Sequence, residues 1–185
     1  MATAPPAFDK WQPLSVVDLQ RELGTFRQWV LCGGYSIDWL VNKATRQHDD
    51  IDVGVFRSDL STCLKAIAEL RVYLCDPPGS LRRWDGKEVP KHVHDIWIAD
   101  AKCSHWILQI MVYDDEDENV IYRRDKRLSW PKGQHAIEVR GLSILNPIIT
   151  LLFKLHRADM RNKDCVDVET LIGVAASCQN LLSGY

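Results

Sequence analysis

Two aspartates two residues apart, Asp50 and Asp52, stand at the start of an alternating apolar segment, residues 50–56, in this chain of 185 residues. Such alternation predicts a β-strand in which residues two apart point to the same face, about 7 Å from each other. Two carboxylates this close repel each other and favour a cation between them. Mg²⁺ suits the position, because it prefers oxygen ligands and is often held by one or two carboxylates plus substrate phosphates. The alternative is an acidic strand end that only faces solvent.

A pair of glycines, Gly33 and Gly34, follows a short apolar run, residues 29–32, that predicts a buried strand. The pattern after the pair predicts a short helix over residues 35–41. Glycine allows positive φ angles and lets a ligand approach the main chain closely. The first N–H groups of a helix lack internal partners, so they can bind an anion. A glycine pair alone is usually a turn, but together with the two acids it predicts metal-dependent chemistry on a nucleoside triphosphate.

These features form one motif, Gly33-Gly34-x-x-x-Asp38 followed by Thr45-Arg46-x-His48-Asp49-Asp50-Ile51-Asp52. The motif resembles the signature of the DNA polymerase β-type nucleotidyltransferases. The resemblance is closest to the small antibiotic adenylyltransferases, the aminoglycoside 2″-O- and lincosamide group. It implies that Asp50 and Asp52 bind Mg²⁺ and that Gly33 and Gly34 hold the triphosphate.

The same resemblance implies roles for residues around this motif. Arg46 and Ser36 are expected in the nucleotide site, although the wider superfamily often has serine directly after the glycines, where this chain has Tyr35. His48 is expected to support the loop that leads to Asp50. Near the C-terminus, Lys154 and the pattern Lys163-Asp164-x-x-Asp167 resemble the related enzymes, which implies that Lys154 reaches the nucleotide phosphates. The alternative is a surface lysine on an amphipathic helix.

A third carboxylate, which family members carry in a later central strand, is missing from its expected place. The corresponding strand is residues 106–113, and its interior polar residue is Gln109. An amide can form hydrogen bonds but cannot take up a proton at neutral pH. Asp95, in the predicted partner strand, would share a face with Gln109 if the connecting loop has an odd number of residues. Alternatively the transfer proceeds without a strong base, because phosphoryl-type transfer depends mainly on positioning and charge stabilisation.

The remaining pattern predicts the elements that position these residues. Helices are expected over residues 13–26, capped by Ser15, over 59–70, and from Pro147 onward. Strands are expected over residues 72–74, 93–98, 107–113 and 120–122, and the acidic run 114–119 is expected to be a hairpin tip. We therefore predict an α+β nucleotidyltransferase fold, with a mixed, mostly antiparallel sheet flanked by helices. Residues 1–145 would form the catalytic domain and residues 146–185 a short helical C-terminal lobe.

Composition narrows the function classes. The net charge is −2 and the most basic segment, residues 123–127, is short and interrupted by an acid, which argues against extended nucleic-acid binding. The six cysteines show no zinc-like spacing, and His92 and His94 have no clear third ligand. No signal-like or membrane-spanning apolar run occurs, so a cytoplasmic protein is expected.

These observations predict an enzyme that uses Mg²⁺ and a nucleoside triphosphate, with ATP the first candidate. It would transfer the nucleoside monophosphate to a hydroxyl of a small-molecule acceptor, such as an antibiotic. A homodimer could complete the acceptor pocket, because the C-terminal lobe is short. The alternative is a catalytically degenerate protein that binds a nucleotide or other small ligand, or that uses the cleft for another reaction. A toxin-type enzyme acting on RNA or protein is a third reading, which the lack of basic surface disfavours for RNA.

Overall fold

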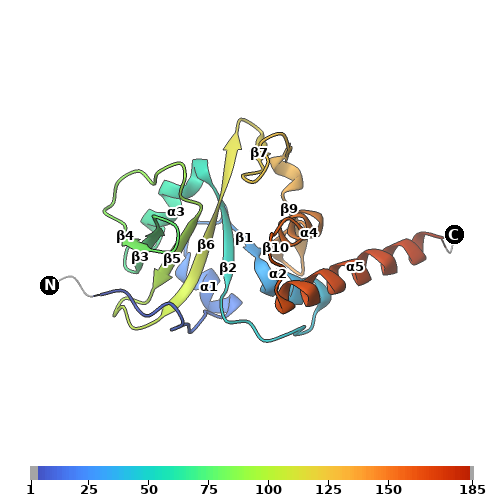
Figure 1. The fold of residues 1–185 in the computed structure, drawn as a ribbon, viewed down its shortest axis with the longest axis horizontal. Helices are drawn as coiled ribbons and strands as arrows, with labels where there is room; N and C mark the ends of the chain where they lie inside the picture. The colour runs from blue at the N-terminus through green and yellow to red at the C-terminus, as the bar shows by residue number, and fades with distance from the viewer. Residues whose placement is uncertain (1–3, 184–185) are drawn as a thin grey trace.

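The computed structural model of the chain describes residues 4–183, with side chains up to Ser177. A mixed sheet runs through the molecule in the order β4-β3-β5-β6-β2-β1-β10-β9, and β7 and β8 extend it beside β6 (Figure 1). Its strands are β1 (Val30–Cys32), β2 (Asp52–Phe56), β3 (Arg71–Cys75), β4 (Leu81–Arg83), β5 (Asp95–Ala99), β6 (Trp106–Glu116), β7 (Asn119–Ile121), β8 (Ser129–Pro131), β9 (Ala136–Val139) and β10 (Leu142–Leu145). Among the described strands, β1 with β10 and β2 with β6 pair in parallel, and the other pairings are antiparallel.

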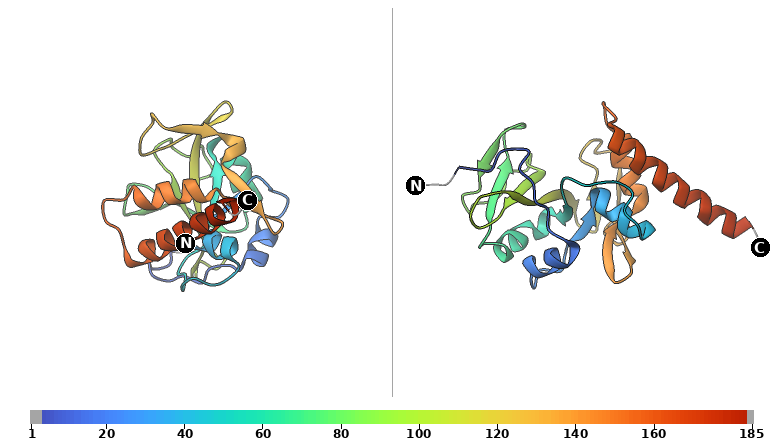
Figure 2. Two further views of the ribbon diagram at one scale, coloured as in Figure 1. Left: turned by 90° about the vertical axis from the view of Figure 1, so that its right-hand side faces the viewer. Right: turned by 90° about the horizontal axis from the view of Figure 1, so that it is seen from below.

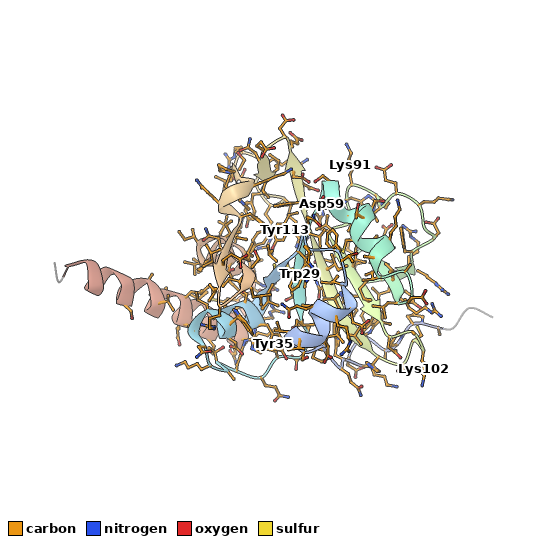
Figure 3. The ribbon with its side chains drawn as sticks, turned by 180° about the vertical axis from the view of Figure 1, so that it is seen from behind. Trp29, Tyr35, Asp59, Lys91, Lys102 and Tyr113 are labelled. Atoms are coloured by element: carbon orange, nitrogen blue, oxygen red, sulfur yellow. The ribbon has the colours of Figure 1, made fainter. Side chains whose placement is uncertain are left out.

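Helices cover this sheet unequally. The helices are α1 (Val16–Glu22), α2 (Gly33–Val41), α3 (Leu60–Ala66), α4 (Pro147–Leu155) and α5 (Asn162–Ser183). Seen from behind, α1 and α3 lie across one face of the sheet (Figure 3). Their apolar side chains, such as Leu19 and Leu64, form the main core with the inward residues of β2, β5 and β6. Ile51, Val53 and Val55 are buried there, as the alternation predicts, which leaves Asp52 on the opposite face.

The C-terminal helices stand beside the β1–β10 end of the sheet. α4 packs on α5, and the first turns of α5 also contact α2, whereas its second half extends away from the body (Figure 2). Asn146 caps α4 by accepting a hydrogen bond from the Ile148 N–H, with Pro147 in the first turn. None of the helices in the described part of the chain is long and apolar enough to span a membrane.

Several element boundaries differ from those predicted. α2 begins at Gly33, so the glycine pair forms the first turn of the helix instead of a turn before it. The helix predicted over residues 13–26 spans only Val16–Glu22, with Ser15 accepting from the Asp18 N–H as its cap. The helix predicted over residues 59–70 is α3, preceded by a 3₁₀ turn at Arg57–Asp59. Leu23 and Ile67 remain buried outside these helices, so apolar periodicity extends beyond the helical hydrogen bonds.

Two polar groups noted in the sequence, the histidine pair and the acidic run, lie near the start of β5 and the end of β6. His92 and His94 precede β5 and lie against different carboxylates, His92 3.0 Å from Asp76 and His94 2.7 Å from Asp114, so they do not converge on a metal position. The acidic run forms the hairpin between β6 and β7, with its tip at Asp117 and Glu118, and the residues before the tip belong to β6, which continues to Glu116. Its first carboxylates belong to the sheet, where they find cationic partners.

His135 is a buried histidine between β8 and β9. Its Nδ1 accepts a hydrogen bond from the Trp130 indole at 3.1 Å, and its ring packs on Phe56 and Tyr113. Its Nε2 has no partner among the described residues. Burial lowers the pKa of His135 to about 4, because the charged imidazolium would lose its hydration.

We expect this histidine to make stability fall in mild acid. Below the ordinary pKa of 6.5 the unfolded chain takes up a proton that the folded chain does not, so the contribution of His135 to stability is full above pH 6.5 and declines toward pH 4. The loss between pH 7 and 4.5 is about 2.5 kcal/mol, and His135→Gln should remove it. Urea unfolding of both proteins at the two pH values measures this, and an equal pH dependence would contradict it.

Candidate active site

The two strand aspartates, Gln109 and Asp95 meet on the sheet face that α1 and α3 leave open. Asp52 of β2 is the register partner of Gln109 of β6, and Gln109 is the partner of Trp97 of β5. Asp95, two residues before Trp97, therefore points to the same face. The Gln109 amide donates a hydrogen bond to Asp95 Oδ1 at 3.2 Å. Together with Asp50, these residues line a cleft of about 220 Å³, so Asp95 places a carboxylate beside the position that Gln109 occupies.

Electrostatics at this cleft favour a bound cation. Burial, together with the negative charges of Asp50 and Asp95, raises the pKa of Asp52 to about 7, although Lys154 lowers it. A divalent ion beside Asp50 and Asp52 would offset this repulsion, and carboxylate oxygens are the ligands that Mg²⁺ prefers. The described residues contain no group of three or more His, Cys, Asp or Glu side chains arranged to hold a metal ion. Two carboxylates would thus need oxygen ligands from a substrate to complete such a site.

Gly33 lets the Asp52 carboxylate lie against the start of α2. Its φ is +64°, and a Cβ at this position would overlap the carboxylate, with the Asp52 Cγ only 3.1 Å away. Gly34 is equally confined, because a Cβ there would collide with His48 and Arg46. Both glycines are therefore required for the approach of the loop and strand to the helix. The neighbouring Ser36 hydroxyl is buried and donates to the Gly33 carbonyl at 2.8 Å, so it braces the turn.

The loop that delivers Asp50 is tied to α2 through Asp38. The Asp38 carboxylate accepts hydrogen bonds from the Thr45 N–H at 2.9 Å and from the Thr45 hydroxyl. His48 Nε2 lies 2.7 Å from the other oxygen of Asp38, and its ring packs on Tyr35 with centroids 4.5 Å apart. The motif residues around the strand aspartates thus hold the loop in place and leave Asp50 free to face the cleft.

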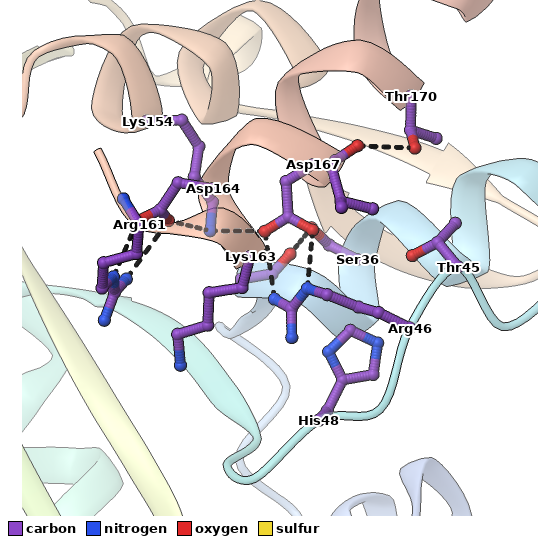
Figure 4. A network of polar contacts seen from close by, with 12 residues as sticks. Ser36, Thr45, Arg46, His48, Lys154, Arg161, Lys163, Asp164, Asp167 and Thr170 are labelled. Atoms are coloured by element: carbon purple, nitrogen blue, oxygen red, sulfur yellow. Dashed lines mark hydrogen bonds and ion pairs between the residues drawn. The ribbon is translucent and has the colours of Figure 1, made fainter.

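A buried network of ion pairs joins this loop to the C-terminal helices (Figure 4). Asp164 and Asp167, in the first turns of α5, are fully buried. Arg46 binds Asp167 through two hydrogen bonds of 2.9 and 3.0 Å. Lys154 of α4 bridges the two acids, 3.0 Å from Asp164 and 2.6 Å from Asp167. Arg161 is also 2.7 Å from Asp164, and these cations hold the pKa of Asp164 far below its usual range despite its burial.

The network presents positive charge to the cleft. The cationic residues that line the cleft are Arg123, Arg124, Lys154, Arg157 and Arg161. Arg46 is not among these lining residues, because Asp167 draws its guanidinium toward α5. The sequence had marked Lys154 but assigned no role to Arg157, Arg161 and Arg123, whose only signal was a local excess of basic residues. Apart from Arg123, which binds Asp95, these cations belong to the segment 154–161 or contact it, whereas Asp50, Asp52 and Asp95 lie on the sheet, so the cleft has one anionic and one cationic wall.

Comparisons with known proteins agree with this geometry. The model of the aminoglycoside-2″-adenylyltransferase family matches residues 14–75, the part that holds the glycine pair and both strand aspartates. The solved structure of the lincosamide antibiotic adenylyltransferase LnuA, lincomycin-bound, is 16% identical, with a TM-score of 0.52 over 84% of this chain and 91% of that one. The Megavirus polyadenylate synthase is 12% identical, with a TM-score of 0.52 over 85% of this chain and 30% of that one.

A third solved structure, ANT(2″)-Ia in complex with adenylyl-2″-tobramycin, is 13% identical, with a TM-score of 0.45 over 82% of each chain. No curated protein sequence matches this chain. The α+β fold and the resemblance predicted from the motif are confirmed by the family model and the first two structures.

Proposed function

We propose that this chain, whose fold is that of the nucleotidyltransferases and which resembles the antibiotic adenylyltransferases, transfers AMP from ATP to a hydroxyl group of a small molecule. The observation that carries the proposal is the convergence of Asp50, Asp52 and Asp95 on one wall of a cleft whose other wall is cationic. Such a cleft can hold a triphosphate between the two walls. We also propose that residues 1–145 act as the catalytic domain and residues 146–185 as a helical lobe that supplies part of the cationic wall.

Asp50 and Asp52 would hold Mg²⁺. The ion fits the donors present, because two carboxylates on a half-buried strand end repel each other and offer the oxygen ligands that Mg²⁺ selects. When bound, Mg²⁺ neutralises charge that develops on the phosphates and helps to orient them.

The cationic wall and the start of α2 would bind the triphosphate. Lys154, Arg157 and Arg161 line the cleft, and together with Arg46 they outnumber the two carboxylates that they bind, Asp164 and Asp167. Guanidinium groups suit phosphate oxygens, because they donate two parallel hydrogen bonds. Gly33 and Gly34 would bring the first N–H groups of α2 close to the phosphates without a side chain in between.

Asp95 would act on the acceptor. The acceptor hydroxyl oxygen forms a bond to the α-phosphorus, the bond from that phosphorus to the bridging oxygen breaks, and pyrophosphate leaves with the electron pair. The hydroxyl proton passes to Asp95. The Gln109 amide and the Arg123 guanidinium, 3.2 and 3.1 Å from its two oxygens, would fix the orientation of this carboxylate. Gln109 is then a positioning residue and does not mark a lost base.

Pyrophosphate release tests this function. We expect the wild type to release pyrophosphate from Mg·ATP when a panel of hydroxylated antibiotics is supplied, and Asp95→Asn to lower kcat about 100-fold or more while ATP affinity changes little. Gln109→Glu should not raise the rate, because it adds a negative charge beside Asp95 and Asp52.

The degenerate alternative gives different results in the same assay. A protein that only binds nucleotide would keep its affinity for Mg·ATP, measured by calorimetry, and release no pyrophosphate with any acceptor. Activity created by Gln109→Glu would show that the native cleft lacks an acid, which would contradict the role of Asp95.

A further inference from the structure

A second and larger cleft adjoins the proposed active site. Its volume is about 540 Å³, and it lies between the end of β6, the segment 91–94 that precedes β5, and the segment 121–126. A small space of about 10 Å³ shares Met111, Tyr113 and Phe153 with the active-site cleft and Asp114 and Ile121 with the larger cleft, and we call it the passage. Arg123 lines all three spaces. We call the larger space the outer cleft.

Polar contacts hold the walls of the outer cleft. Arg57 binds Asp114 at 2.6 Å and donates to the main-chain carbonyls of Lys91 and Val93, which fixes the segment at the rim. His94 lies 2.7 Å from the other oxygen of Asp114. The Asp115 side chain is only 3% exposed and binds Lys132 at 2.6 Å. These contacts indicate that the cleft is formed before any ligand arrives.

The same contacts change the charge that the cleft offers to a ligand. Asp114 and Asp115 lie in an acidic run that could have faced a cationic acceptor, but Asp114 is paired with Arg57 and Asp115 with Lys132. Lys91 and Lys126, both exposed at the cleft, form no ion pair with any described residue. Of the acids that line the cleft, Glu116 alone forms no ion pair within the described chain. The charge left for a ligand is therefore positive.

We propose that the outer cleft binds the acceptor of the proposed transfer, and that this acceptor is a hydroxylated small molecule that is neutral or anionic, not a polycation. The proposal rests on the proposed function. The volume is that of a pocket for a molecule of drug size. Asp95 lies where the two clefts approach each other, since Arg123 binds it and lines the passage. A hydroxyl that enters the passage from the outer cleft reaches the carboxylate that would take its proton.

The proposal is tested with three sugars that share the glucose ring and differ in charge. They are glucuronate, which is anionic, methyl glucoside, which is neutral, and glucosamine, which is cationic. Their affinities are measured by ligand-observed NMR titration in the presence of Mg²⁺ and a non-hydrolysable ATP analogue. For the wild type we expect glucuronate to bind most tightly and glucosamine most weakly. The double variant Lys91→Glu/Lys126→Glu should shift the ratio of these two affinities about tenfold toward glucosamine, because opposite charges attract at the cleft surface.

The matched control is Lys65→Glu/Lys87→Glu. These lysines line another hollow of about 430 Å³ beside α3 and do not line the outer cleft, so the same charge change there should leave the ratio unaltered. Glucosamine bound as tightly as glucuronate, no binding of any of the three sugars, or an unchanged ratio in Lys91→Glu/Lys126→Glu would overturn the proposal. Mg·ATP affinity, measured on the same proteins, reports separately on the proposed function, and the lysine variants should leave it intact.

Discussion

Asp52→Asn should abolish nucleotidyl transfer and at the same time stabilise the metal-free protein. Asp52 is the carboxylate that lies against both Gly33 and the register partner Gln109, at the centre of the cleft. An asparagine has nearly the same shape but cannot supply the negative charge that a magnesium site needs. We expect kcat to fall at least about 10³-fold, which corresponds to about 4 kcal/mol of transition-state stabilisation.

The gain in stability follows from the pKa of the same group. Burial and the charges of Asp50 and Asp95 raise the pKa of Asp52 to about 7, well above the value of an unfolded chain. The folded protein therefore holds a proton that the unfolded chain releases, so the contribution of Asp52 to stability declines as pH rises from about 4 to 7. Asparagine removes this penalty, which reaches at most about 4 kcal/mol at pH 8. A functional carboxylate kept at a cost to stability is typical of an active site.

Calorimetric unfolding at pH 8 with and without Mg²⁺ measures both effects. The wild-type Tm should rise on addition of Mg²⁺, because the ion binds only the folded state, whereas Asp52→Asn should have a higher Tm that Mg²⁺ does not change. Asp49→Asn is the matched control, since its side chain is 75% exposed. A Tm of Asp52→Asn below that of the wild type would indicate a structural role for the carboxylate.

The local part of the site could be predicted from the sequence because it depends on short spacings. The period of two placed Asp50 and Asp52 at one strand end and Ile51 and Val53 in the core, and the structure confirms this burial. The position of Asp95 relative to Gln109 remained open, because it depends on the length of a hairpin loop. It also depends on an irregularity of the β5–β6 pairing at Ile98 and Ala99. No pattern in the sequence predicts this irregularity.

Contacts between distant residues could not be predicted in this way. Arg46 and Asp167 are 121 positions apart, and Arg57 and Asp114 are 57 apart. From the sequence alone, a charged residue can equally be predicted to contact a ligand or to form an ion pair within the protein. Only the fold shows which of the two it does. Arg46 was therefore assigned to the nucleotide, whereas in the structure its guanidinium is bound to Asp167.

Asp167→Ala should cost the protein much of its stability and weaken the proposed nucleotide site. The carboxylate is fully buried and holds two cations, Arg46 from the loop that delivers Asp50 and Lys154 from the cleft wall. Removing one partner of a buried pair leaves charge without compensation, which costs about 3–5 kcal/mol. Because Arg46 would lose its anchor, the Asp50 loop should also become less ordered, and we expect Mg·ATP to bind at least about tenfold more weakly.

Urea unfolding and calorimetric titration with Mg·ATP measure these two losses on one protein. Asp159→Ala, which removes an acid from the exposed turn before α5, is the control and should change neither quantity.

The double variant Arg46→Met/Asp167→Leu separates the loss of stability from the loss of nucleotide affinity. It replaces a buried pair by apolar groups and should recover part of the stability. It cannot restore the tie between the loop and α5, so nucleotide affinity should stay low. If affinity returned together with stability, the network would serve the fold alone and would have no part in holding Asp50 at the cleft.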